Sequence, residues 1–241
     1  MLNEYVKPGN VIEIIDKDLD NPEERSAKTL RTRIFDIVSD DVIKVTIPTV
    51  QGKLQLIETD GEYDVYFYTS NGLYQCTCTV KDRYRTNAIP IMELELQSNL
   101  RRYQRREYYR LNCMLEMKCH AFDEEETDEY IKTGNYSTAT GLKSPNAVMV
   151  DISGGGARFV SVDSYEVGAL ILFRFSLKQA TGIKEYSVVG RVVYSEVMEN
   201  MGGKYENRAQ FVDIENTERE SIIKYIFEEE RRIRKTTTEK S

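Results

Sequence analysis

Hydrophobicity alternates with a period of two residues in short segments along most of this chain, and this pattern restricts the fold more than any other feature. The first series comprises residues 11–15, 32–38, 42–48, 53–58, 63–69, 72–80 and 89–96. Because successive side chains of a strand point to opposite faces, the period predicts β-strands with one buried face. Several short strands separated by turn signals are typical of a small barrel or sandwich.

A second series follows at residues 111–122, 147–153, 157–161, 169–177, 185–197 and 205–214. Residues 123–146 are acidic and then rich in Gly, Ser, Thr and Asn, so we expect a loop or insertion there. The period then changes, because Thr217 and Glu220 have the form of a capping box and apolar residues recur at helical spacing. We therefore predict one amphipathic helix over 217–235, whose apolar stripe covers one end of the second barrel.

Residues 99–110, which we call the arginine segment, separate the two series, and five arginines fall within 101–110. A polar, charged stretch between two patterned regions indicates a domain boundary. The sequence thus predicts a mostly β protein. Two small β-barrel domains, residues 1–98 and 111–241, are joined by the arginine-rich linker, and the second ends in a C-terminal α-helix.

Composition argues against several classes of function. The net charge is −7 over 241 residues, whereas proteins that bind nucleic acid polymers carry a basic domain or stripe. The chain shows no apolar leader and no run of about 20 apolar residues, so we expect a cytoplasmic protein without a membrane span. The four cysteines are then expected to be free thiols.

Arg106 and Arg110 are the first candidates for ligand binding, with Arg105 beside them. A guanidinium group matches phosphate oxygens bidentately, matches the O6/N7 edge of guanine, and can stack on a base. One cluster of arginines can therefore recognise both parts of a guanine nucleotide. The alternative is a solvated basic linker, or a run that forms surface ion pairs with the acidic residues 123–129.

A second candidate is the segment from Asp151 to Gly156, in which Ser153 precedes three glycines. Glycines at a strand end are free to adopt φ > 0, and backbone N–H groups in such a turn can surround an anion. Asp151 could accept hydrogen bonds from guanine N1–H and its amine. The alternative is an ordinary tight hairpin with a Ser or Asx turn.

Other polar residues do not form a catalytic or metal site. The spacing of Cys76 and Cys78, and of Cys113 and Cys119, is wrong for the common structural zinc sites. His120 is the only histidine, and no nucleophile motif accompanies it. We therefore expect no metal, no cofactor and no catalysis.

Taken together, Arg106-x-x-x-Arg110 and Asp151-x-Ser153-x-x-Gly156 resemble the double motif of the PilZ domain, the cyclic di-GMP receptor module. The resemblance covers about residues 101–230. It implies that Arg106 and Arg110 hold phosphate and guanine, and that Asp151, Ser153 and Gly156 hold the other face of the ligand. Arg105 matches the extra arginine that accompanies binding of an intercalated ligand dimer.

The first series resembles the N-terminal domain of YcgR-type flagellar brake proteins, mainly in its position and strand pattern. That resemblance implies a cytoplasmic effector that changes the orientation of its domains on binding cyclic di-GMP. Its implied partner is a flagellar motor protein, stator or rotor, at the basal body. The alternatives are control of exopolysaccharide synthesis, or docking of a partner without nucleotide. Two departures from the family, Arg208 and the insertion at 123–146, leave the partner surface open.

Overall fold

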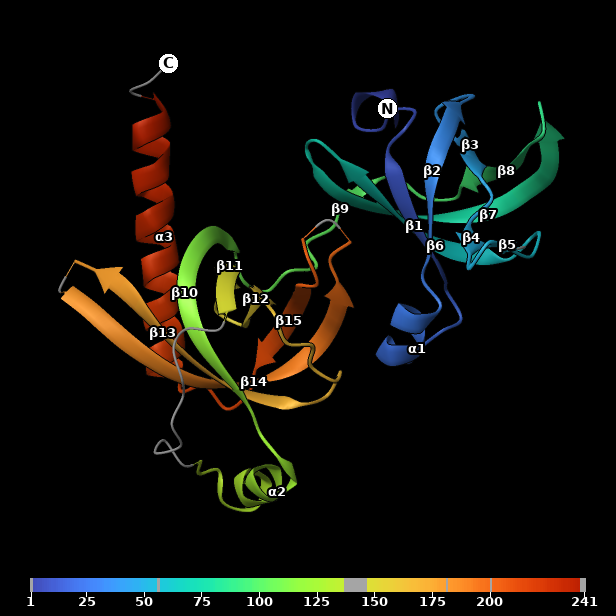
Figure 1. The fold of residues 1–241 in the computed structure, drawn as a ribbon. Helices are drawn as coiled ribbons and strands as arrows, with labels where there is room; N and C mark the ends of the chain where they lie inside the picture. Colours follow the sequence, from blue (N-terminus) through green and yellow to red (C-terminus); the bar gives the residue numbers. More distant parts are fainter. Residues whose placement is uncertain (1, 56, 137–146, 181, 200, 239–241) are drawn as a thin grey trace. The chain divides into compact units, whose positions relative to one another are not determined.

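The structure, a computed structural model, describes residues 2–55, 57–136, 147–180, 182–199 and 201–238 (Figure 1). The chain divides into two compact units, Met1–Arg105 and Arg106–Ser241. Each unit has its own cluster of buried apolar side chains, so each has a separate core.

The first unit is a closed antiparallel barrel with the strand order β6-β1-β2-β3-β8-β7, completed by pairing of β6 with β7. Its strands are β1 (Val11–Asp16), β2 (Leu30–Ile37), β3 (Val42–Thr46), β6 (Glu62–Thr69), β7 (Gly72–Thr86) and β8 (Ile89–Leu96). Smaller elements are the 3-10 helix η1 (Leu2–Glu4), helix α1 (Pro22–Ala27), the β4–β5 hairpin (Thr49–Val50 and Lys53–Leu54), and β9 (Arg101–Arg102), which pairs with β7. Closure leaves no long unpaired strand edge.

The core of this barrel follows from the alternation in the sequence. Ile12 and Ile14 on β1 are buried, as are Val65 and Phe67 on β6. Cys76 and Cys78 fill two further buried positions on β7 as free thiols, with their Sγ atoms 3.4 Å apart. The contact with Cys76, together with burial, raises the pKa of the Cys78 thiol, so both residues act as small apolar side chains.

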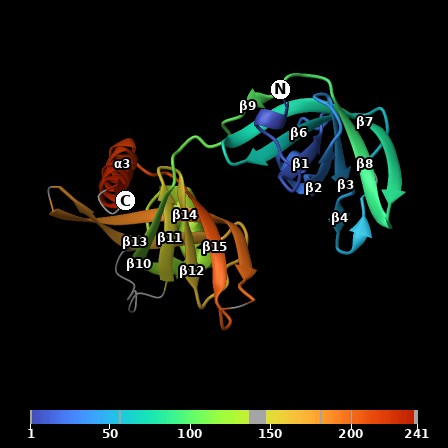
Figure 2. The same ribbon diagram turned by 90° about the horizontal axis from the view of Figure 1, so that it is seen from above.

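The second unit is a closed six-stranded barrel with the order β10-β11-β12-β15-β14-β13 (Figure 2). The strands are β10 (Leu111–Ala121), β11 (Ala147–Ser153), β12 (Gly156–Ser161), β13 (Leu170–Gln179), β14 (Gly182–Val197) and β15 (Tyr205–Phe211). The predicted fold class, two β-barrels and a C-terminal helix, is confirmed.

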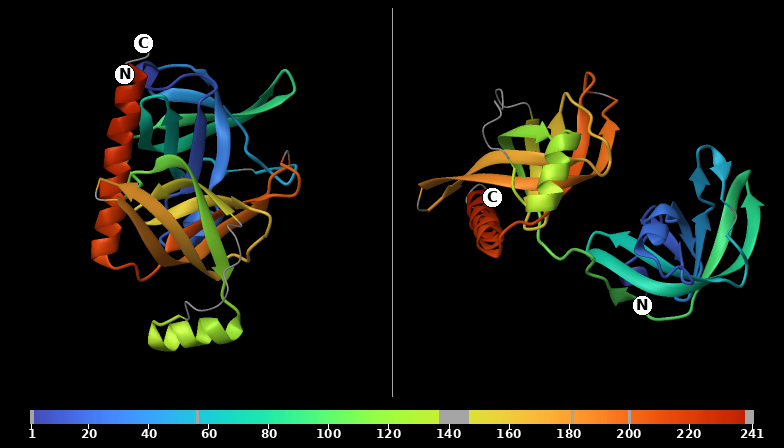
Figure 3. Two further views of the ribbon diagram at one scale, coloured as in Figure 1. Left: turned by 60° about the vertical axis from the view of Figure 1, so that its left-hand side comes forward. Right: turned by 90° about the horizontal axis from the view of Figure 1, so that it is seen from below.

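The expected loop at 123–146 is wrong for its first half, because α2 occupies Glu124–Thr133. Asp123 and Glu126 form a reciprocal capping box, and Gly134 ends the helix in the left-handed conformation. Tyr130 packs with Leu170 and other outward-facing side chains, so α2 lies outside the barrel wall (Figure 3). Residues 137–146 lie outside the described residues.

The C-terminal helix α3 spans Asn216–Thr238, slightly longer than predicted. Thr217 lies inside its first turn, so the predicted capping box with Thr217 at the N-cap is wrong. Ile222, Tyr225 and Ile226 are buried in the same cluster as the barrel interior, which is why the helix packs along β11 and β13 (Figure 2).

Candidate functional site

The turn between β11 and β12 contains the predicted Asp-x-Ser-Gly motif. β11 ends at Ser153 and β12 begins at Gly156, with the two residues between them at the tip of the hairpin. Ser153 Oγ accepts from the Gly155 N–H at 3.4 Å and donates to the Gly156 carbonyl at 3.2 Å. The serine thus closes its own turn, which is the role that Ser residues commonly take.

The glycines of this turn are needed for space, and they do not use the freedom to adopt positive φ. None of Gly154, Gly155 and Gly156 has a φ between +20° and +160°. A Cβ on Gly156 would lie 2.3 Å from the Ala209 carbonyl oxygen of the neighbouring strand. A Cβ on Gly154 or Gly155 would lie 2.7 or 2.9 Å from the ring of Tyr108. Any side chain here would therefore displace a neighbour.

Asp151 is buried and already holds a partner that the sequence motif does not include. Its Oδ2 accepts from Arg158 Nε at 2.6 Å, and the two residues are opposite each other in the β11–β12 register. Arg158 also donates to Glu206 at 3.2 Å, and Glu206 accepts from Arg208 at 2.7 Å. The signal for Arg158 was its place seven residues after Asp151 across a tight hairpin, which sets the two opposite each other.

The cross-strand network shifts the pKa of its carboxylate. Burial by itself would raise the pKa of Glu206, but hydrogen bonds from Arg208 and Arg158 outweigh it and lower the pKa below its usual value. Arg208 also lies 4.3 Å from the centre of the Tyr194 ring. Arg208 thus belongs to a row of hydrogen-bonded side chains that begins at Asp151 and runs across the neighbouring strands.

The C-terminal part of the arginine segment is anchored to the second unit by Tyr108. From Arg101 to Arg110, Tyr108 alone is half-buried and the other residues are exposed. Tyr108 lies against the glycine turn, and the Arg219 guanidinium is 5.5 Å from its ring centre. The predicted ligands Arg106 and Arg110 lie on either side of this anchor, so the structure brings their segment to the turn that carries Asp151, Ser153 and Gly156.

Arg105 belongs to the first unit and is engaged there. Its guanidinium donates to Glu13 on β1 at 3.1 Å and lies 5.2 Å from the centre of the Tyr68 ring on β6. Arg31 lies over the same ring at 5.7 Å. Burial raises the pKa of Tyr68 to about 12, so the hydroxyl stays neutral. No local pattern could predict Glu13 as the partner of Arg105, because the two residues are 92 positions apart in the chain.

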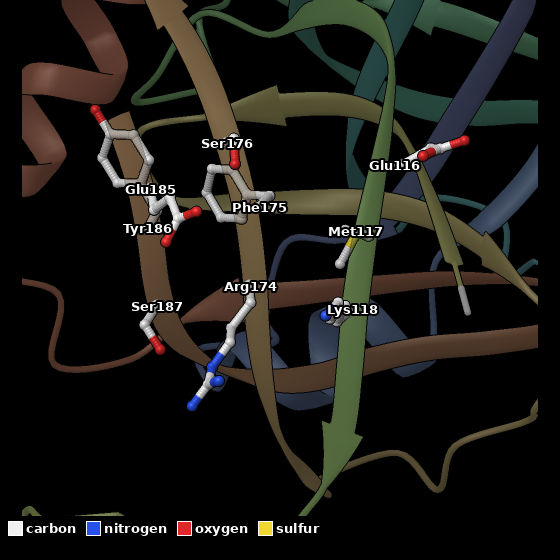
Figure 4. A pocket seen from close by; sticks show the side chains of 9 residues that line it. All are labelled: Glu116, Met117, Lys118, Arg174, Phe175, Ser176, Glu185, Tyr186 and Ser187. Carbon is white, nitrogen blue, oxygen red and sulfur yellow. The ribbon is translucent and has the colours of Figure 1, made fainter. Parts of the chain in front are cut away.

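A hollow on the outer wall of the second barrel lies apart from these residues (Figure 4). It is formed by β10, β13 and β14, where Lys118, Arg174 and Ser187 occupy one cross-strand row. None of the six predicted site residues lines it. The predicted ligand contacts therefore lie on an exposed segment and on a largely buried turn, away from this hollow.

The described residues contain neither a membrane-spanning helix nor a cluster of metal-ligating side chains. Among them, no helix is long and apolar enough to cross a membrane. Within the same part of the chain, no group of three or more His, Cys, Asp or Glu side chains converges as a metal site would require.

Paired arginines before the first strand of a closed six-stranded barrel, and an Asp-x-Ser-Gly turn after its second strand, together define one class, the PilZ barrels. Comparison with protein families agrees, since the PilZ domain family matches residues 104–228, more than half of the chain. The chain belongs to the PilZ domain family. Residues 7–96 match the family described as flagellar protein YcgR. No curated protein matches the chain.

Solved structures show the same two-barrel fold. The Bacillus subtilis inhibitor of motility (MotI/DgrA) has a TM-score of 0.72 at 15% identity, covering 93% of this chain and 98% of that protein. YcgR from Escherichia coli, solved in complex with c-di-GMP, has a TM-score of 0.50 at 11% identity, covering 97% and 89%. The family resemblance predicted from the sequence is thus confirmed.

Proposed function

We propose that this protein is a cytoplasmic receptor for cyclic di-GMP that regulates a partner by binding and not by catalysis. The observation that carries the proposal is the packing of Tyr108, in the arginine segment, against the glycine turn. It sets the segment that bears Arg106 and Arg110 against the turn that bears Asp151, Ser153 and Gly156. Membership of the PilZ family and the ligand in the YcgR structure support the same choice of ligand.

Each residue has a role that its chemistry suits. Arg106 and Arg110 bind phosphate oxygens and stack on or pair with guanine. Asp151 accepts from guanine N1–H and the exocyclic amine. Its Oδ2 already accepts from Arg158, but a carboxylate has about four lone-pair sites, so capacity remains for guanine. Arg105 adds a further cation where an intercalated ligand dimer binds.

The output that we propose is a change in the relative orientation of the two barrels, with control of motility through a flagellar motor protein. The arginine segment is the covalent connection between the units, so ordering it constrains their joint. Similarity of the first barrel to the YcgR family, and of the fold to an inhibitor of motility, supports this output. Control of exopolysaccharide synthesis is the second candidate.

Thermal unfolding with and without cyclic di-GMP tests the proposal. A ligand that binds only the native state stabilises it, by about 2.7 kcal/mol at a concentration 100 times Kd. We expect the ligand to raise Tm of the wild type, and Arg106→Ala or Arg110→Ala to reduce this stabilisation by about half or more. The loss of one charge-assisted contact costs about 1.5–3 kcal/mol, roughly a 10- to 100-fold loss of affinity.

Arg101→Ala is the matched control, because Arg101 is an exposed arginine on β9, outside the motif. It should respond to ligand as the wild type does. An unchanged Tm of the wild type at saturating ligand would overturn the proposal and favour a docking module without nucleotide.

A further inference from the structure

Helix α3 has a second contact face beside the one that packs on the barrel core. Its core face includes Ile222, Tyr225 and Ile226. The second face is a stripe at intervals of four, four and three residues along the helix, made of Arg219, Ile223, Phe227 and Glu230. Residues at this spacing lie above one another on one side of a helix.

The N-terminal half of this stripe contacts both Tyr108 and the glycine turn. Arg219 Nη1 donates to the Gly154 carbonyl at 2.9 Å and lies 3.5 Å from the Tyr108 hydroxyl. Ile223 closes the other side, since a Cβ on Gly154 would lie 2.8 Å from its Cγ1. The ring of Tyr108 therefore packs against Gly154, Gly155 and Arg219.

The C-terminal half of the stripe contacts Tyr109. Its ring stacks on Phe227 with the ring centres 6.2 Å apart, and its hydroxyl donates to Glu230 at 2.6 Å. Two consecutive tyrosines, which lie between Arg106 and Arg110 in the chain, are thus fixed to one helix face. These two contacts help to define the path of a segment whose other residues are mostly exposed.

We propose that Tyr108 and Tyr109 are positioning residues, which dock the arginine segment on the second face of α3 and so preorganise Arg106 and Arg110 for the ligand. This inference rests on the proposed function. Ordering the residues of a free chain costs conformational entropy, so a segment that must be ordered during binding binds more weakly. The tyrosines remove that cost before the ligand arrives. The same inference explains why positions 154 and 155 are glycines, because a side chain at either position would displace the Tyr108 ring.

The test measures the affinity for cyclic di-GMP by calorimetric titration of full-length variants. Tyr108→Ala should lower affinity by about 10-fold or more. Tyr108→Phe should stay within about threefold of the wild type, because the ring contacts remain and only the polar contacts of its hydroxyl, with Arg219 and Glu107, are lost. Tyr109→Ala should have a smaller effect than Tyr108→Ala, since the Tyr109 ring is 48% exposed.

A double-mutant cycle separates positioning from general destabilisation. Arg219→Ala should reproduce much of the loss of Tyr108→Ala, and the double variant should be no worse than the single ones, because both changes release one contact. Arg231→Ala, an exposed arginine of α3 outside the stripe, is the matched control and should bind as the wild type does. Gly155→Ala places a methyl group against the Tyr108 ring and against no core residue, so it should also lower the affinity for cyclic di-GMP.

The outcomes distinguish this inference from the proposed function. If the wild type does not bind cyclic di-GMP, the proposed function fails. If the wild type binds and Arg106→Ala does not, while folded Tyr108→Ala and Gly155→Ala both retain wild-type affinity, the positioning role alone is overturned. Equal losses in Tyr108→Ala and Tyr108→Phe would also contradict it.

Discussion

Asp151 has two roles in this account. Its buried carboxylate accepts a hydrogen bond from Arg158, and we propose that it also binds guanine. Arg158 holds one oxygen at 2.6 Å, and the burial of the Asp151 side chain makes this contact stronger than a fully exposed ion pair. The contact fixes the orientation of the carboxylate before ligand binds. Orientation matters for base recognition, since a purine is identified by hydrogen bonds along one edge.

Replacing Asp151 should impair guanine recognition more than phosphate recognition. We expect Asp151→Ala to lower the affinity for cyclic di-GMP by about 10-fold or more, and to reduce the preference for it over cyclic di-AMP, because adenine lacks the N1–H and amine donor pair. Competition titrations with both ligands measure the preference. A mutant that keeps the wild-type preference would show that Asp151 serves only the turn and Arg158.

Glu13 should act as a competitor for Arg105. If Arg105 contributes to the ligand site, its ion pair with Glu13 must be given up, and an exposed pair of this kind is worth about 0.2–1 kcal/mol. Glu13→Gln should therefore raise the affinity for cyclic di-GMP by about two- to fivefold. Glu62→Gln, which breaks the Lys17 pair of the same unit, is the control.

The Arg105→Ala background completes that experiment. There, Glu13→Gln should have no effect, because the competing cation is gone. An equal gain in both backgrounds would contradict the competition and assign the effect to the general charge of the first barrel.

At the scale of elements, crowding at the β11–β12 turn makes its last glycine a stability determinant as well as a site residue. Gly156→Ala places a methyl group 2.3 Å from a backbone carbonyl that cannot move without its strand. We expect a loss of about 1–3 kcal/mol in the free energy of unfolding without ligand, measured by urea titration.

Gly203→Ala offers the comparison for that substitution. Gly203 has open space around its Cβ position but a φ of +77°, so backbone strain alone should cost roughly 1 kcal/mol. If Gly156→Ala unfolds at the same urea concentration as the wild type, the crowding does not constrain this turn.

Elements with a clean period could be predicted from the sequence, and those that depend on tertiary contacts could not. The β11 range 147–153 matched, because its alternation and its glycine end were both local signals. Helix α2 was missed, since its capping box lies in an acidic run and its packing partners come from distant strands. The site motif could be found in the sequence, and the hairpin spacing could have indicated Arg158. Glu13 and Arg219 could not be predicted, because each meets its partner only through the folding of distant segments.

At the scale of the whole molecule, the two barrels have separate cores, and the chain between them bears the arginines. Packed cores resist deformation, whereas a linker changes φ and ψ cheaply. Small-angle scattering should therefore show a change in overall shape when cyclic di-GMP saturates the wild type, and no change in Arg106→Ala. Superimposable curves for the wild type would instead indicate that ligand alters only a local surface.

The central claim, that the arginine segment and the glycine turn bind cyclic di-GMP, is tested most directly by one calorimetric titration of the full-length protein at low and at high salt. We predict saturable binding of one or two ligand molecules per chain, with affinity that falls as salt rises, because arginines that meet phosphates are screened within about 8–10 Å at ordinary ionic strength. The Arg106→Ala variant should show no saturable heat. Absence of binding to the wild type, or binding that Arg106→Ala leaves intact, would contradict the account.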